Sequence, residues 1–135
     1  MKITKIETLI GSDPAAGNLI YVRTHTDAGI YGVGEVYPVG PDMASTVWVE
    51  YFAEQLVGQD PTEIERNWAL CYQGARFPIG SSGLAALSAI EVSLGDITGK
   101  VLNKPVYELM GGKVRDKIRA YWDIHGSTPE ELAED

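Results

Sequence analysis

The spacing of apolar residues changes once along the chain, about a third of the way in. Before that point, residues 2–10, 19–26 and 30–37 alternate between apolar and polar types, as half-buried strands do. The connection 27–29 ends in glycine, which suits the left-handed position of a three-residue hairpin loop. We therefore predict a three-stranded antiparallel meander, with residues 11–18 as the loop between its first two strands.

After the change, apolar residues recur at spacings of three and four, which indicates helices. Asp42 can cap a first helix, which Gly58 can end. Asp60 is the cap residue of a second helix-start signal, with proline in the first helical position and Glu63 in the third. A short turn of helix is expected from Pro105 to the glycine pair at 111–112.

The longest predicted helix follows residues 80–82 and should bury a complete face. Three small residues would let a neighbouring element approach this helix closely: Ala85, Ala86 and Ala89. Its apolar stripe consists of Leu87, Ile90, Leu94, Ile97 and Val101.

The last segment resembles the start of a different architecture. Residues 118–124 alternate like a strand, and Thr128 then begins a helix with Pro129 first and Glu131 third. A strand followed by a new helix is the first unit of a β/α repeat. We therefore expect an α+β domain at 1–112, a meander followed by a helical bundle, and at 113–135 the start of a barrel that is cut off.

Composition narrows the class of protein. The formal net charge is -8, which argues against nucleic-acid binding because phosphates need a Lys/Arg surface. The N-terminus lacks the apolar region of a signal peptide, and no apolar run is long enough to span a bilayer, so we expect a cytoplasmic protein without membrane contact. Cys71 is the only cysteine, which excludes an intramolecular disulfide and favours a buried apolar role.

Four segments in the same order resemble the mandelate racemase/muconate lactonizing enzyme family of the enolase superfamily. Residues 26–35 read T-D-A-G-I-Y-G-V-G-E, and residues 89–100 read A-I-E-V-S-L-G-D-I-T-G-K. Residues 105–112 read P-V-Y-E-L-M-G-G, and R-A-Y at 119–121 resembles the opening of the first barrel strand. The chain departs from the family pattern at Gly95, where a tryptophan is usual, and at Glu91, where aspartate is common. Both departures affect how the capping domain is expected to pack on the barrel.

The resemblance implies an N-terminal capping domain followed by the first strand of a catalytic barrel. Such enzymes abstract the proton α to a carboxylate and stabilise the enediolate on Mg²⁺. Their metal ligands and bases lie on later barrel strands, so no catalytic residue and no metal ligand is expected in this chain. We expect a sugar-acid dehydratase that is a homo-oligomer and acts on a small carboxylate. A racemase, epimerase or cycloisomerase, or a free-standing binding or assembly module that complements a separate barrel, remain alternatives.

In this family two cap loops shape the pocket, and they correspond to residues 11–18 and 37–42. Ser12 and Asp13 are candidates for contacting a polyol, although loops are polar in any case. Tyr37 offers an aromatic wall with a hydroxyl, or plain packing. Asp123 and His125 share one side of the expected barrel strand near its carboxyl end, where barrel active sites form, or are merely a polar strand end.

Other polar residues receive structural interpretations. Glu35 follows a glycine inside the hairpin and is expected to be hydrogen-bonded locally. His25, near a hairpin tip, is expected in solvent, and Arg76 is expected to be a surface cation. The glycines of 32–34 lack the third glycine and the following helix of a dinucleotide site, so they indicate a bulge or a close backbone approach.

Overall fold

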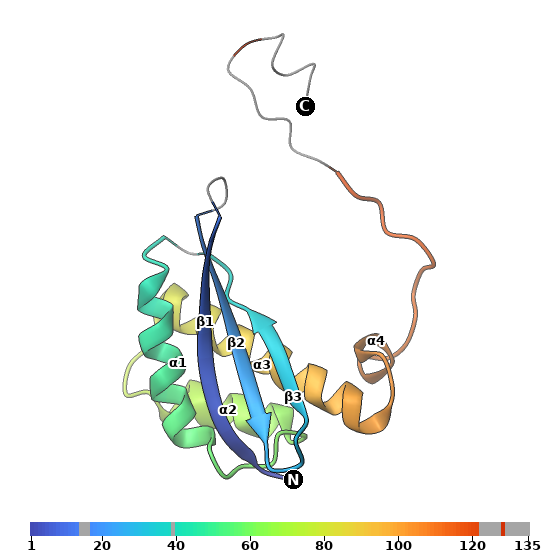
Figure 1. The fold of residues 1–135 in the computed structure, drawn as a ribbon, viewed down its shortest axis with the longest axis horizontal. Coiled ribbons are helices and arrows are strands. Elements are labelled where there is room, and N and C mark those ends of the chain that lie inside the picture. Colours follow the sequence, from blue (N-terminus) through green and yellow to red (C-terminus); the bar gives the residue numbers. More distant parts are fainter. Residues whose placement is uncertain (14–16, 39, 122–127, 129–135) are drawn as a thin grey trace.

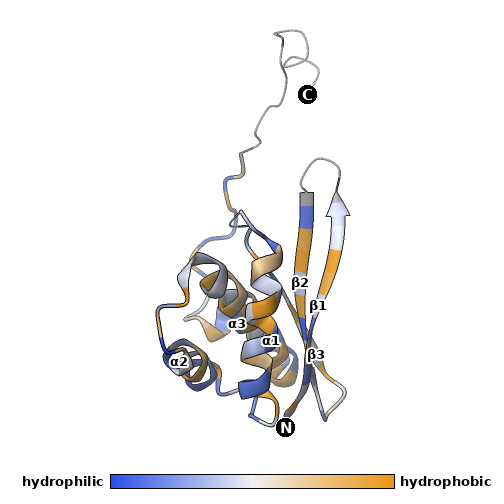
Figure 2. Ribbon diagram, turned by 90° about the vertical axis from the view of Figure 1, so that its left-hand side faces the viewer, coloured by the Kyte–Doolittle hydropathy of each residue, from blue (hydrophilic) through white to orange (hydrophobic). Residues whose placement is uncertain are grey.

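The helices that contact the three-stranded sheet lie on one of its faces, as Figures 1 and 2 show. The computed structural model describes residues 1–13, 17–38, 40–121 and 128. The strands are β1 (Ile3–Asp13), β2 (Gly17–Thr26) and β3 (Tyr31–Glu35), antiparallel in the order β1-β2-β3. This confirms the predicted meander.

The turn between β2 and β3 follows the expected chemistry. Gly29 has φ 74°, the left-handed conformation that glycine adopts at no steric cost, and Thr26 N–H donates to the Ile30 carbonyl at 3.1 Å. The predicted loop at 11–18 was too long. Gly11 pairs with Leu19 and Ser12 pairs with Asn18, because the β1–β2 ladder continues to Asp13.

Helix α3 (Gly80–Leu102) crosses behind the sheet and contacts β3 most extensively. The two glycines of β3 make this contact possible. A Cβ built on Gly32 would lie 2.0 Å from the Ser93 carbonyl oxygen, and one built on Gly34 would lie 2.0 Å from the Ala89 carbonyl oxygen. The expectation of a close backbone approach is therefore confirmed, and no residue with a side chain fits at either position.

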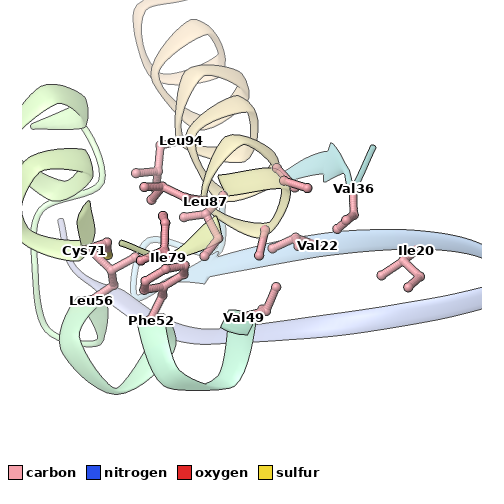
Figure 3. Close-up of a cluster of buried hydrophobic side chains, with 14 of the residues drawn as sticks. Ile20, Val22, Val36, Val49, Phe52, Leu56, Cys71, Ile79, Leu87 and Leu94 are labelled. Atoms are coloured by element: carbon pink, nitrogen blue, oxygen red, sulfur yellow. The ribbon is translucent and has the colours of Figure 1, made fainter. Parts of the chain in front are cut away.

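The stripe of α3 is buried as predicted, apart from its last member. Val101 is 42% exposed, because the helix has by then passed beyond the sheet. The other stripe residues join the core with side chains from β2 and α1 (Met43–Leu56), shown in part in Figure 3. The core comprises Ile3, Ile20, Val22, Val36, Val49, Phe52, Leu56, Cys71, Ile79, Ala85, Ala86, Leu87, Ala89, Ile90, Leu94 and Ile97.

The first two helix starts differ from the predicted capping. Asp42 precedes α1 but has helical angles and makes no side-chain cap bond. Asp60 instead forms a turn in which its carboxylate accepts from Thr62, so α2 begins at Ile64 and runs to Gly74. A short polar side chain that bonds its own backbone two residues on competes with the helix, which is why the start is delayed.

The predicted strand at 118–124 is not formed in its described part, residues 118–121. Helix α4 (Val106–Leu109) ends before Gly111 and Gly112, both at positive φ, and the chain then leaves the body of the domain. Ile118 is 83% exposed and has no neighbouring strand in the described part of the chain. A strand needs a hydrogen-bonded neighbour, so the alternating sequence alone does not produce one. Residues 122–124 and the helix expected after Thr128 lie outside the described residues.

Candidate functional site

The β1–β2 hairpin forms one of the two segments expected to shape a pocket. Strand β3 pairs only with residues 21–25 of β2, so the hairpin beyond this region is a two-stranded ribbon. The ribbon extends past the helical layer in Figures 1 and 2. Ser12 lies on this ribbon opposite Asn18, and both residues are exposed. Ser12 is therefore held by a strand ladder rather than by a loop.

The second segment leaves β3 beside the base of the same ribbon. Val36 is buried, and its N–H donates to the Ile20 carbonyl at 2.8 Å, which fixes where the chain leaves the sheet. Tyr37 follows with 74% of its surface exposed. Asp42 N–H then donates to the Gly40 carbonyl at 2.8 Å, just before α1.

Both segments lie at one end of the domain, as Figure 1 shows. Ser12 and Tyr37 are both exposed there, so their hydroxyl groups are accessible to a ligand. The side chain of Asp13 lies outside the described part of the structure, as do Asp123 and His125. The structure thus places Ser12 and Tyr37 at the same end of the domain and the backbone of Asp13 on the β1–β2 ladder, whereas Asp123 and His125 lie outside the described residues.

Two structural interpretations of polar residues were wrong. Glu35 is exposed, and its carboxylate has no hydrogen bond within the described residues, because its strand position directs it toward the open face of the sheet. His25 is not simply solvated: its side chain is 33% exposed, and its Nε2 lies 2.9 Å from Glu7 Oε1. Arg76 is exposed and lies 5.6 Å over the Phe77 ring, as fits a surface cation.

Sequence reasoning missed a charged cluster on the open face of the sheet. Glu7 of β1 accepts hydrogen bonds from Lys5 and from Arg23 of β2, whose Nη2 lies 2.7 Å from Glu7 Oε1. The hydrogen bonds from Lys5, then His25 and Arg23, lower the pKa of Glu7 from 4.5 to about 2. The signal was present, since these residues occupy the same face in the predicted strands. The hydrogen bonds of Glu7 to Arg23 and His25 join β1 to β2 on this face.

A hollow of about 540 Å³ opens between α2, α3 and α4, above Gly95. A Cβ at Gly95 would come no closer than 3.9 Å to Val106 Cγ1, so the space that a large side chain would fill is empty. Glu91 lines the hollow, and its pKa is raised by burial and, to a lesser degree, by the nearby Glu65. The departure from the family pattern at Gly95 thus has a local structural consequence.

The described residues contain no group of three or more His, Cys, Asp or Glu residues that could hold a metal ion. Cys71 is fully buried, which confirms its predicted apolar role, and burial raises the pKa of its thiol to about 12. No helix in the described part of the chain is long and apolar enough to cross a membrane.

Comparison with known proteins agrees with a three-stranded antiparallel sheet backed by helices. Residues 6–111 match the family described as "Mandelate racemase / muconate lactonizing enzyme, N-terminal domain". This chain belongs to that family, and its fold is the capping domain of the enolase superfamily.

Relatives extend the comparison to whole enzymes. D-galactonate dehydratase of Cronobacter sakazakii is 41% identical over 134 residues, which cover 98% of this chain and 34% of the relative. A solved enolase from Agrobacterium radiobacter with bound Na and L-malate is 40% identical, has a TM-score of 0.84 and is matched over 90% of this chain and 30% of its own. An enolase from Pantoea ananatis with bound D-gluconate and Mg is 35% identical and has a TM-score of 0.78. The match covers 85% of this chain and 28% of the enolase. This chain therefore spans about a third of the length of these relatives.

Proposed function

We propose that this chain is the capping domain of a parent enzyme that dehydrates a sugar acid. The observation that carries the proposal is the 41% identity to D-galactonate dehydratase along nearly all of this chain. The D-gluconate bound by the Pantoea ananatis enolase supports the same substrate class. The capping domain is residues 1–112 and the barrel begins at 113; the family match, which stops at residue 111 beside the glycine pair, supports this division.

Dehydration of a sugar acid removes the proton α to the carboxylate and the hydroxyl group on the next carbon. The two leave together as water, and the remaining enol tautomerises to a 2-oxo-3-deoxy acid. Because this chain belongs to a capping-domain family and a solved relative from Pantoea ananatis holds Mg, we assign Mg²⁺ and the catalytic base to the barrel of the parent. The parent also provides the interface for a homo-oligomer.

The capping domain contributes closure and specificity. The Ser12 hydroxyl on the ribbon and the Tyr37 phenol beside it bind hydroxyl groups of the substrate, and Asp13, Asp123 and His125 complete the polar lining. Closing these segments over the barrel excludes water from the reacting carbanion. Substitutions here should therefore change substrate choice more than the chemistry of proton removal.

The test begins with the mass of the natural protein. A mass well above 14.7 kDa indicates a parent with a barrel, and that protein is screened with aldonic and aldaric acids, with and without Mg²⁺. We expect release of a 2-oxo acid from at least one of them. A change in optical rotation without a 2-oxo acid would identify a racemase or epimerase instead, and no turnover of any acid would refute the proposal.

The alternative is a free-standing module that lacks the barrel. Val114, Ile118 and Tyr121 are between 83% and 88% exposed, so in isolation they would present apolar surface to water. This exposure speaks against independence. A natural protein of 14.7 kDa that is strictly monomeric and unfolds cooperatively would favour the free-standing module.

A further inference from the structure

Strand β3 is an edge strand, and within the described residues only β2 pairs with it. The bonds from Thr26 N–H to the Ile30 carbonyl and from Val36 N–H to the Ile20 carbonyl show which backbone groups face β2. By the alternation of a strand, the backbone groups of Tyr31, Val33 and Glu35 face the other way. Such a row of outward N–H and carbonyl groups is a template for pairing with another chain.

Two side chains of α3 occupy part of this row. Asp96 Oδ2 accepts the Val33 N–H at 3.0 Å, and Lys100 Nζ donates to the Tyr31 carbonyl at 2.7 Å. The two side chains also bind each other at 2.8 Å, one helical turn apart. Lys100 Nζ lies 4.8 Å from the centre of the Tyr31 ring, a cation–π contact that further holds it over the strand.

These two bonds have the pattern of a strand partner. In a parallel pair, a residue of the partner strand lies opposite a given residue of this strand. Its N–H donates to the carbonyl of the preceding residue of this strand, and its carbonyl accepts from the N–H of the following residue. The pair Asp96–Lys100 does the same around Gly32, with a carboxylate as acceptor and an ammonium as donor. The absence of a side chain at Gly32 lets α3 come close enough, since a Cβ there would lie 2.0 Å from the Ser93 carbonyl oxygen.

We propose that Asp96 and Lys100 act as an edge cap that closes β3 to strand addition by a second copy of this chain. A symmetric antiparallel pairing of two β3 strands centred on Val33 needs the Val33 N–H, which Asp96 already holds. Tyr31 and Val33 are 48% and 36% exposed, so the uncapped strand would offer a β-branched and aromatic surface to its copy. This edge cap gives a non-catalytic role to an acidic and a basic residue that are separated by one helical turn near the end of α3.

The test compares two double variants of the full chain. Asp96→Ala/Lys100→Ala removes the cap, whereas Lys104→Ala/Glu108→Ala removes another i,i+4 ion pair just beyond α3 that does not touch β3. Amide hydrogen exchange of Val33 and sedimentation velocity over a concentration series are the readouts. At a concentration where the chain is monomeric, we expect exchange at Val33 to be faster by about tenfold or more; at higher concentrations we expect association beyond that of the control.

A third variant locates the contact. Val33→Pro, added to the uncapped chain, removes the N–H that strand pairing needs and is tolerated on an edge strand. The extra association should then disappear; association that persists would place the contact elsewhere and overturn the proposal. So would unchanged exchange at Val33 in the folded uncapped chain. If the double variant does not fold, the single variants Asp96→Ala and Lys100→Met are judged by the same two readouts.

Discussion

Gly34 lies directly against Ala89, so that a Cβ on the glycine would come within 2.0 Å of the Ala89 carbonyl oxygen. The contact joins the strand that leads to Tyr37 with the longest helix of the domain. Backbone touching backbone leaves no flexible side chain that could move aside. The position of the sheet on α3 therefore depends on this glycine and on Gly32.

Replacing Gly34 by alanine should destabilise the domain by about 3 kcal/mol or more, because α3 has to shift away from the sheet. Urea denaturation measures the loss. Gly11→Ala is the matched control: it is also a strand glycine, but its Cβ would meet nothing closer than 3.9 Å. The control should change stability by less than about 0.5 kcal/mol. Equal effects at the two positions would contradict the close approach.

The glycines of α3 should respond in opposite directions. Gly95→Ala has room, with the nearest atom at 3.9 Å, and should stabilise the domain by up to about 1 kcal/mol through helix propensity. Gly99→Ala places a Cβ 2.8 Å from the Lys104 carbonyl oxygen and should destabilise it. Both substitutions lie in one helix, so urea midpoints compare them directly. A loss at Gly95 would show that the hollow above it is not open, and a gain at Gly99 would contradict its close contact with the Lys104 carbonyl oxygen.

The Cys71 thiol should be inert while the chain is folded. Its pKa of about 12 leaves almost no thiolate at about pH 8, and the thiolate is the nucleophile. Alkylation followed by mass spectrometry should proceed only as fast as the domain opens, and urea should accelerate it. Ser12→Cys in a Cys71→Ala chain provides the exposed control and should react at once. Rapid modification of folded Cys71 would contradict its burial.

Glu7 should give the domain an acid-sensitive contribution to stability. Its pKa is lowered from 4.5 to about 2, so the folded state binds this proton more weakly than the unfolded state. The contribution is therefore complete above about pH 4.5 and is lost as the pH falls toward 2. The Tm difference between the natural chain and Glu7→Gln should shrink over that range, and also in about 1 M salt, which screens exposed charges. A difference that stays constant with pH would refute this role.

Local patterns were sufficient for most elements. The hairpin at Gly29 and the buried stripe from Leu87 to Ile97 depend on turn chemistry and on residue spacing, which a sequence displays directly. Element ends were less predictable. Asp60 bonds Thr62 rather than capping α2, and the choice between these two bonding patterns depends on where α2 packs.

The candidate site was predictable only by position. The sequence alone determined that Ser12 and Tyr37 lie near strand ends of the meander, since strand order is a local property. Only the tertiary structure decided that Ser12 stands on a ladder, that Glu35 faces the open side of the sheet, and that Asp96 reaches Val33. The physical reason is that these outcomes depend on the register between β1 and β2 and on how closely α3 approaches the glycines of β3, and both bring together residues far apart in the chain.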